Sequence, residues 1–200
     1  GNNIDGIDFS LEDDYYGDTR FHIPFIAWYQ VMNASLALTT MEVLKDRIPV
    51  TMEQLQAGIA NTRWQGRMET ILPGVIVDGA HNEDGVRRFV ETAERFQKKY
   101  PLTLLFSAVN DKDYQDMIHT ICSRIKFRKV VTTEVGGYRE VPSAELAEIF
   151  CKEGCKDVGN SDNIEEAFHM AHEAKGEDGM LFCVGSLYLV GEIKTLLLKK

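Results

Sequence analysis

The chain has 200 residues, of which 44% are hydrophobic, and it carries a formal net charge of −9 at pH 7. This length and apolar fraction suffice for one large or two small globular domains. Because Lys and Arg supply most of the affinity for nucleic-acid phosphates and anionic membranes, the acidic balance argues against both as partners. No apolar run approaches the ~20 residues that span a bilayer, and the first residues are neither basic nor apolar as in a signal peptide. We therefore expect a cytoplasmic protein that binds small molecules or proteins.

The first part of the chain predicts a few small elements. Residues 1–19 are polar and acidic, which indicates an irregular segment or a hairpin. Residues 19–25 alternate in hydrophobicity, and Pro24 cannot donate to a central ladder, so a short edge strand is expected there. Residues 28–44 are apolar on most faces, the pattern of a buried helix.

A second helix is predicted over residues 51–60, because T51-M-E-Q54 has the spacing of a capping box. The pattern of apolar residues changes after this helix, and we place a domain boundary near residue 62. Residues 1–61 look too small to form a domain of their own, which leaves residues 62–200 as the main domain.

From residue 62 onward, short apolar runs alternate with helical stretches, the signature of an α/β fold. Strands are predicted at 68–72, 75–77, 102–109, 129–133 and 180–184. Helices are predicted at 83–98, 113–124, 143–153, 163–175 and 187–198, the third with Ser143 as its cap. A Pro73-Gly74 turn joins the first two strands into a hairpin. The expected fold is a Rossmann-like open sheet, mostly parallel with one antiparallel strand, with helices on both faces.

The segment D78-G-A-H-N82 follows a wholly apolar strand and precedes a helix. Ligands of open parallel sheets bind beyond the carboxyl ends of strands, near helix N-termini. Asp78 could accept hydrogen bonds from ribose hydroxyls, and His81 could donate to an anionic substrate or transfer a proton. Alternatively, Asp78 and Asn82 are helix caps and His81 is a surface residue. Spacing alone leaves the two interpretations evenly matched.

Two further residues could line the same site. Ser186 lies in F182-C-V-G-S-L187, where a strand ends and the last helix begins, although a plain N-cap is the simpler interpretation. Arg67 follows the turn W64-Q-G66 and could bind a phosphate through two parallel hydrogen bonds, or be an ordinary surface charge.

Metal and phosphate motifs are weak or absent from the sequence. The four cysteines, 122, 151, 155 and 183, form no C-x-x-C and are expected to be buried free thiols, with Cys155 beyond a helix end at Gly154. Cys151, Cys155, His169 and His172 only loosely suggest a metal site. The nearest approach to a phosphate loop, G154-C-K-D-V-G-N-S161, lacks the required lysine and is interpreted as a turn.

Four motifs occur together in a characteristic order: A27-W-Y-Q-V-M-N-A-S-L-A-L38, N61-T-R-W-Q-G-R67, V77-D-G-A-H-N82 and V184-G-S-L-Y-L-V-G-E192. In this order the chain resembles folylpolyglutamate synthase and dihydrofolate synthase of the Mur ligase superfamily. The resemblance covers the tail of the central ATPase domain and the whole C-terminal domain. It implies an ATP-dependent ligase, using Mg²⁺, that phosphorylates the carboxylate of folate or dihydropteroate and joins it to L-glutamate.

The resemblance also implies roles for individual residues. Asn33 resembles the residue that contacts adenine, and Arg67 the arginine that reaches the phosphates. Asp78 resembles the aspartate that contacts the nucleotide, while His81 and Ser186 resemble residues near the substrate and the transferred phosphoryl group. Arg139 matches the family pattern too loosely to be given a role.

Several expectations follow from what the sequence lacks. It contains no phosphate loop and none of the family's magnesium ligands, so we expect no ligase turnover and at most weak nucleotide binding from these residues alone. The helix at 28–44 is expected to expose apolar surface and to favour self-association, whereas the parent enzyme is expected to be a monomer. Two alternatives stay open: another Mur-type amino-acid ligase, or a non-catalytic α/β nucleotide-binding module.

Overall fold

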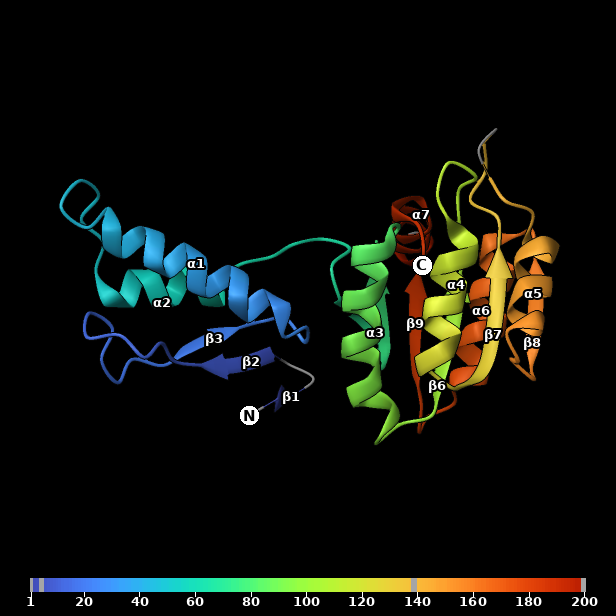
Figure 1. Cartoon of the computed structure of the whole chain (residues 1–200), viewed down its shortest axis with the longest axis horizontal. Coiled ribbons are helices and arrows are strands. Elements are labelled where there is room, and N and C mark those ends of the chain that lie inside the picture. Colours follow the sequence, from blue (N-terminus) through green and yellow to red (C-terminus); the bar gives the residue numbers. More distant parts are fainter. Residues whose placement is uncertain (1, 4–5, 138–139, 199–200) are drawn as a thin grey trace. The chain divides into compact units, whose positions relative to one another are not determined.

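The computed structural model describes residues 2–3, 6–137 and 140–198. It divides into two compact units, Gly1–Gln65 and Gly66–Lys200, which are considered separately below (Figure 1). The proposed origin of the first unit, as the tail of an ATPase domain, stays a prediction.

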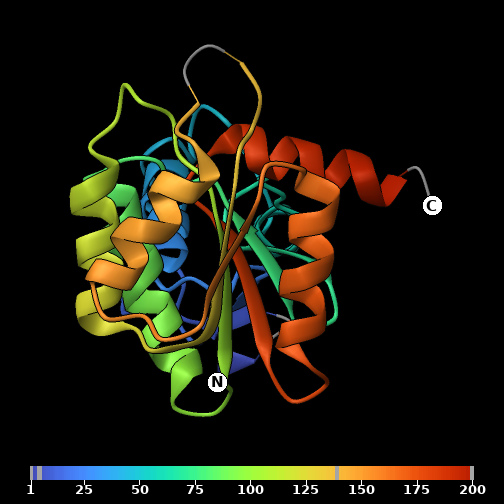
Figure 2. The same ribbon diagram turned by 90° about the vertical axis from the view of Figure 1, so that its right-hand side faces the viewer.

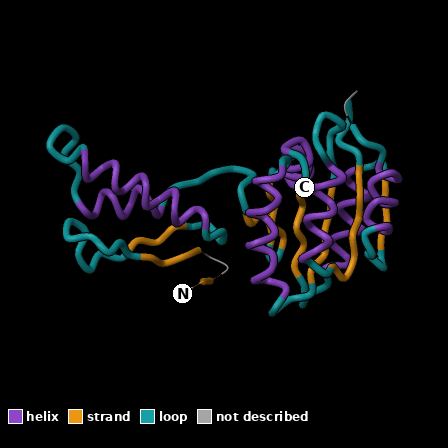
Figure 3. Tube along the Cα trace, in the orientation of Figure 1, coloured by secondary structure: helices purple, strands orange, loops and turns teal. Residues whose placement is uncertain are grey.

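The first unit combines a small antiparallel sheet with two helices (Figure 3). Its elements are β1 (Asn2–Asn3), β2 (Gly6–Phe9), β3 (Phe21–Ile23), α1 (Tyr29–Val43) and α2 (Met52–Ala60). The strand order is β1-β2-β3, so the predicted edge strand is confirmed. Of residues 1–19, β1 and β2 pair antiparallel, while residues 10–19 are irregular. The capping box is also confirmed, because Gln54 N–H donates to Thr51 Oγ1 while Thr51 N–H donates to Gln54 Oε1.

Helix α1 buries only one of its faces within the structure. Gln30, Val31, Ala34 and Leu38 are buried. Met32 and Leu36 on another face are 66% and 70% exposed. The interpretation of this segment as a buried helix is therefore correct for one face only, and the expected exposed apolar surface is confirmed.

The second unit is a six-stranded sheet in the order β4-β5-β9-β6-β7-β8. Its strands are β4 (Glu69–Leu72), β5 (Val75–Asp78), β6 (Leu102–Phe106), β7 (Phe127–Thr133), β8 (Val158–Ser161) and β9 (Met180–Val184). Only the β4–β5 pair is antiparallel, with Gly74 at φ +70° in the predicted turn. The predicted fold class is confirmed.

Five helices cover this sheet on both faces. They are α3 (Glu83–Gln97), α4 (Tyr114–Arg124), α5 (Ser143–Lys152), α6 (Ile164–Lys175) and α7 (Leu187–Leu198). Figure 2 shows α3, α4 and α5 on one face and α6 and α7 on the other. The central strands β5, β6 and β9 are buried at every position, as expected for strands covered on both sides.

Two local predictions in this unit were wrong. Val158–Ser161, interpreted as part of a turn, forms the edge strand β8. Ser143 does not cap α5 with its side chain: Pro142 is the N-cap residue, and the buried Ser143 hydroxyl donates to Asp162 instead. In the part of the chain that is described, no helix is long and apolar enough to cross a membrane.

Candidate functional site

Three strand ends meet at one edge of the second unit's sheet. Asp78 at the end of β5 and Phe106 at the end of β6 both pair with Val184 at the end of β9. Since these pairings are parallel, the segments that follow all leave the sheet at the same edge, called here the carboxyl edge. Asp78, His81 and Ser186 therefore lie together, as the sequence predicts for a ligand site.

Asp78 is the buried carboxylate of this edge. Its Oδ2 accepts the N–H of Met68 at 2.9 Å, and its Oδ1 accepts the N–H of Ala80 at 2.8 Å. Burial raises the pKa of Asp78 to about 6, and the two N–H bonds, Arg67 and His81 act in the opposite direction. The carboxylate is not a helix cap; it ties the β5 end to the segment that carries Arg67.

Residues 66–69, called here the Arg67 turn, are held by three further contacts. Gly66 C=O accepts the N–H of Gly79 at 2.7 Å, and Gly66 N–H donates to Glu69 Oε2 at 2.7 Å. Lys194 of α7 donates to both oxygens of Glu69, at 2.8 and 3.0 Å. Met68, the only described non-glycine residue with positive φ, has φ +45°, which is a strained conformation for a side chain of this size.

Arg67 itself is half-buried. Among the described residues its guanidinium has no hydrogen-bonded or ion-paired partner, although its charge acts on Asp78. A cation on a backbone fixed at both ends, with no counterion bound to it, is suited to receive an anionic group.

The start of α7 closes one side of the site. A Cβ on Gly79 would lie 2.1 Å from Leu187 Cδ2, so the loop after β5 packs directly on this helix. Ser186 is buried, and its hydroxyl oxygen accepts the N–H of Tyr188 at 3.1 Å. The simpler interpretation of Ser186 as an N-cap is thus supported, and its hydroxyl proton is left to donate elsewhere.

His81 is fixed by a single hydrogen bond. Its Nδ1 lies 2.7 Å from Gly79 O. Because a carbonyl oxygen can only accept, Nδ1 carries the proton and Nε2 of the neutral ring carries a lone pair. Asn82 is the N-cap of α3 and accepts the N–H of Gly85 at 2.8 Å, so the capping interpretation is correct for this residue.

A cavity of about 220 Å³ opens beside His81. It is lined by His81, Asn82, Glu83, Asp111, Lys112, Asp113, Asp116 and Met117. Lys112 supplies a positive charge and four carboxylates supply negative charge, so the cavity offers groups for both ends of a small zwitterion. Sequence reasoning did not select residues 111–113. N110-D-K-D-Y114 nevertheless directly follows a predicted strand, as do the segments that contain Asp78 and Ser186.

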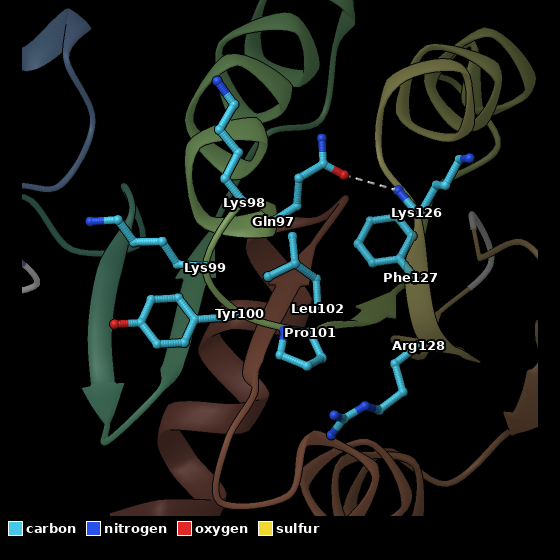
Figure 4. A pocket seen from close by; sticks show the side chains of 9 residues that line it. All are labelled: Gln97, Lys98, Lys99, Tyr100, Pro101, Leu102, Lys126, Phe127 and Arg128. Atoms are coloured by element: carbon cyan, nitrogen blue, oxygen red, sulfur yellow. Dashed lines mark hydrogen bonds between the residues drawn. The ribbon is translucent and has the colours of Figure 1, made fainter.

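A larger hollow of about 720 Å³ lies at the opposite edge of the sheet, where β6 and β7 begin. Its cations are Lys98, Lys99, Lys126 and Arg128. Figure 4 shows the three lysine side chains pointing in different directions. Arg128 is neutralised by Asp178, with nitrogen–oxygen distances of 2.8 and 3.0 Å.

Two other residues singled out in the sequence are not among the described residues of the second unit. Asn33 belongs to the first unit, is exposed, and donates from Nδ2 to Gln30 Oε1 at 2.8 Å. Arg139 lies outside the described residues. Within residues 2–3, 6–137 and 140–198, no group of three or more His, Cys, Asp or Glu side chains could hold a metal ion.

Comparison with known proteins identifies the family of the chain. The family model for the Mur ligase glutamate ligase domain matches residues 66–187. Dihydrofolate synthase/folylpolyglutamate synthase of Bacillus subtilis is 30% identical over 194 residues, which are 93% of this chain and 43% of that protein. The chain thus spans less than half the length of this relative.

Solved structures of folylpolyglutamate synthases share the fold. The enzyme of Mycobacterium tuberculosis, complexed with ADP and AMPPCP, has a TM-score of 0.73 and 25% identity over 88% of this chain and 42% of its own. The enzyme of Thermotoga maritima has a TM-score of 0.72 and 26% identity over 91% of this chain and 42% of its own. The resemblance noted in the sequence is therefore confirmed, and the chain belongs to the Mur ligase family, with residues 66–187 as its glutamate ligase domain.

Proposed function

We propose that this chain is the C-terminal part of an ATP-dependent ligase that joins L-glutamate to folate or dihydropteroate. The observation that carries the proposal is the Arg67 turn, which the buried Asp78 carboxylate fixes at the carboxyl edge of the sheet. Stabilising the transition state of phosphoryl transfer requires cationic and hydrogen-bonding groups that are already in place around spreading negative charge.

In the proposed reaction, ATP phosphorylates the carboxylate of the folate-type substrate, and the amino group of glutamate then displaces phosphate to form an amide. Arg67 contacts the phosphates, and Ser186 donates its free hydroxyl proton to the transferred phosphoryl group. His81 accepts the proton that the attacking amine loses, because its Nε2 has a lone pair while Nδ1–H is held by Gly79 O.

The other assignments follow from the same resemblance. Asp78 contacts the nucleotide, and Asn33 contacts adenine. The cavity beside His81 holds the incoming amino acid, with Lys112 facing a carboxylate and the acidic residues facing the ammonium group. Mg²⁺ compensates the charge of the triphosphate when it is bound, and its ligands belong to a part of the enzyme other than the described residues.

The proposal includes the location and assembly state of the enzyme. We place the parent in the cytoplasm as a monomer. The chain by itself self-associates through the apolar face of α1, where Met32 and Leu36 are largely exposed.

The test is an assay of the full-length protein with ATP and labelled L-glutamate, offering folate, dihydropteroate and a cell-wall nucleotide precursor in separate reactions. Labelled glutamate is expected on a folate-type acceptor, with ADP released in proportion. Incorporation only into the cell-wall precursor would instead identify another Mur-type ligase, and the absence of ATP-dependent incorporation with every acceptor would contradict the proposal.

The 200 residues alone are a second test. They contain no phosphate loop, so we expect no turnover from them. An ATPase signal from the purified chain that depends on both folate and glutamate would show that the chemistry does not need the missing part.

A further inference from the structure

Two of the four cysteines lie close together in the second unit, far from each other in the sequence. The Sγ atoms of Cys122 and Cys155 are 3.6 Å apart. Both residues are half-buried, whereas Cys151 is exposed and Cys183 is fully buried. Sequence reasoning treated all four as buried thiols, which is wrong for Cys151 and overlooks this pair.

The position of Cys155 is fixed by the way α5 ends. Gly154 has φ +92°, Cys155 N–H donates to Phe150 O at 3.1 Å, and Gly154 N–H donates to Cys151 O at 3.0 Å. These are the two hydrogen bonds of a Schellman motif, a standard helix end that requires a left-handed residue at the glycine position. The thiol is therefore presented by an ordered turn.

The position of Cys122 is fixed by the packing of α4 beside α5. Tyr114 at the start of α4 donates to Glu145 Oε1 at 2.7 Å. Further along, His119 Nδ1 lies 3.0 Å from Glu153 Oε2. The two helices thus lie side by side in the same direction, and Cys122 in the last turn of α4 meets the segment that follows α5.

We propose that Cys122 and Cys155 form a redox-modification site, a thiol pair that a low-molecular-weight disulfide oxidises to an intramolecular disulfide bond. A disulfide has an S–S length of about 2.05 Å, so the sulfur atoms must approach by roughly 1.5 Å, a distance that small side-chain rotations can cover. No third metal-binding side chain joins the pair among the described residues, which favours a disulfide over a metal site.

Cys155 is the attacking group of this pair. The contact with the Cys122 thiol lowers the pKa of Cys155 although its burial acts in the opposite direction, while the same contact and burial raise the pKa of Cys122. The nearby Glu153 carboxylate raises the pKa of both thiols and so limits the effect on Cys155. Only the thiolate is nucleophilic, so reaction begins at Cys155.

The exchange proceeds in two steps. Cys155 thiolate attacks one sulfur of the small disulfide, and the S–S bond breaks to release one small thiol and leave a mixed disulfide on Cys155. Cys122 then loses its proton and attacks Cys155 Sγ, which releases the second small thiol. The two cysteines are oxidised, the small disulfide is reduced, and the two cysteine protons end on the two released thiols.

The site is independent of the proposed ligase function. Cys122 lies in the last turn of α4, whereas the cavity beside His81 is lined by Asp113, Asp116 and Met117 at the start of that helix. The cross-link would join α4 to the connection between α5 and the edge strand β8, and it would enclose β7 and α5 in a covalent ring.

The test is oxidation of the purified folded chain with oxidised glutathione, followed by alkylation of free thiols and peptide mapping by mass spectrometry without reduction. The expected product is a Cys122–Cys155 linked peptide, in about tenfold or greater excess over any internal disulfide that contains Cys151, because the fold and not sequence proximity selects the partner. In guanidinium chloride this excess should disappear, since Cys151 and Cys155 are then the nearest pair along the chain.

Variants supply the controls. Cys151→Ser should keep the linked peptide, while Cys122→Ser and Cys155→Ser should each remove it. The proposal is overturned if the folded wild-type chain yields mainly Cys151–Cys155, or if only mixed disulfides with glutathione form while Cys122 is still fully alkylated.

Discussion

The two edges of the same sheet differ in what holds their charged groups. The edge where β6 and β7 begin has the larger hollow and more cations, but its lysine side chains diverge and Arg128 is neutralised by Asp178 (Figure 4). The carboxyl edge has a smaller cavity, a buried Asp78 and an Arg67 that has no ion pair with any described residue.

We infer from this contrast that fixed geometry, and not the size of a hollow or the number of charges, distinguishes the candidate site. The Arg67 turn is held by Asp78, Gly79 and the Glu69–Lys194 pair, whereas the lysine side chains of the opposite edge point in different directions. Groups that are oriented in advance lose little free energy when they bind developing charge. The predictions below test this difference.

The largest effect is expected from Arg67→Ala in the full-length protein. Loss of a preorganised donor to the transition state should reduce turnover by about 10²-fold or more. Lys99→Ala, which removes a cation from the opposite edge, is the matched control and should leave turnover unchanged. Turnover of both variants is measured by steady-state kinetics. Equal losses of turnover would contradict the proposal that the carboxyl edge, and not the opposite edge, takes part in catalysis.

The next effect concerns the packing of the carboxyl edge. Gly185 has φ +111°, and a Cβ there would lie 2.1 Å from the backbone oxygen of Ser107. Gly185→Ala should therefore lower the free energy of unfolding by about 2–4 kcal/mol. Gly191→Ala in α7 is the control: a Cβ at Gly191 meets nothing within 4 Å. It should be neutral or raise stability by about 0.5–1 kcal/mol. Denaturant unfolding of both variants measures the difference.

The buried carboxylate gives a pH-dependent effect of similar size. The pKa of Asp78 is raised from 3.8 to about 6 in the folded chain, so folding favours the protonated form. The stability that this supplies is fully present below about pH 4 and is lost as the pH rises through 6, a change of about 3 kcal/mol.

The measurement is the free energy of unfolding of the wild type and of Asp78→Asn between pH 4 and pH 7. At pH 4 the variant should have a lower free energy of unfolding than the wild type, because its amide oxygen and nitrogen cannot both accept the Met68 and Ala80 N–H groups. As the pH rises, the wild type should lose stability and the difference between the two proteins should become smaller. Parallel profiles would show that Asp78 does not titrate in this range.

The smallest effect is expected from the ion pair behind the Arg67 turn. Lys194→Met leaves Glu69 unpaired and should lower turnover by several-fold, which corresponds to about 1 kcal/mol. Lys129→Met removes the ion pair between Lys129 of β7 and Asp157, and the Lys129 side chain is 24% exposed compared with 27% for Lys194. Both variants should lose a similar amount of unfolding free energy, but only Lys194→Met should lose turnover. If both lose turnover, the loss results from lower stability and not from the Arg67 turn.

The sequence predicts the fold well wherever an element is buried on both sides. The runs that became β5, β6 and β9 are apolar except for Asp78 at the end of β5 and Thr103 in β6, which identifies them as central strands. Strand β8 was missed because V158-G-N-S161 is a polar, half-exposed edge strand without that signal. The prediction of Ser143 as a cap was wrong because its hydroxyl donates a hydrogen bond to Asp162, which is distant in sequence.

The site was only partly predictable for the same reason. Asp78, His81 and Ser186 follow apolar strands, so their common edge could be inferred from the order of elements. The Met68–Asp78 bond depends on a strained φ, and the Lys194–Glu69 pair joins residues 125 positions apart. Neither contact has a local sequence pattern that could predict it. The same is true of the Cys122–Cys155 contact.

The most direct test of the central claim is an amide NMR titration of the isotope-labelled 200-residue chain with ADP at millimolar concentrations. Weak binding at the preorganised edge predicts chemical-shift changes that cluster at residues 66–68, 79–82 and 186–188. Changes that cluster instead at residues 98–100 and 126–128 would contradict the assignment of the carboxyl edge as the nucleotide site.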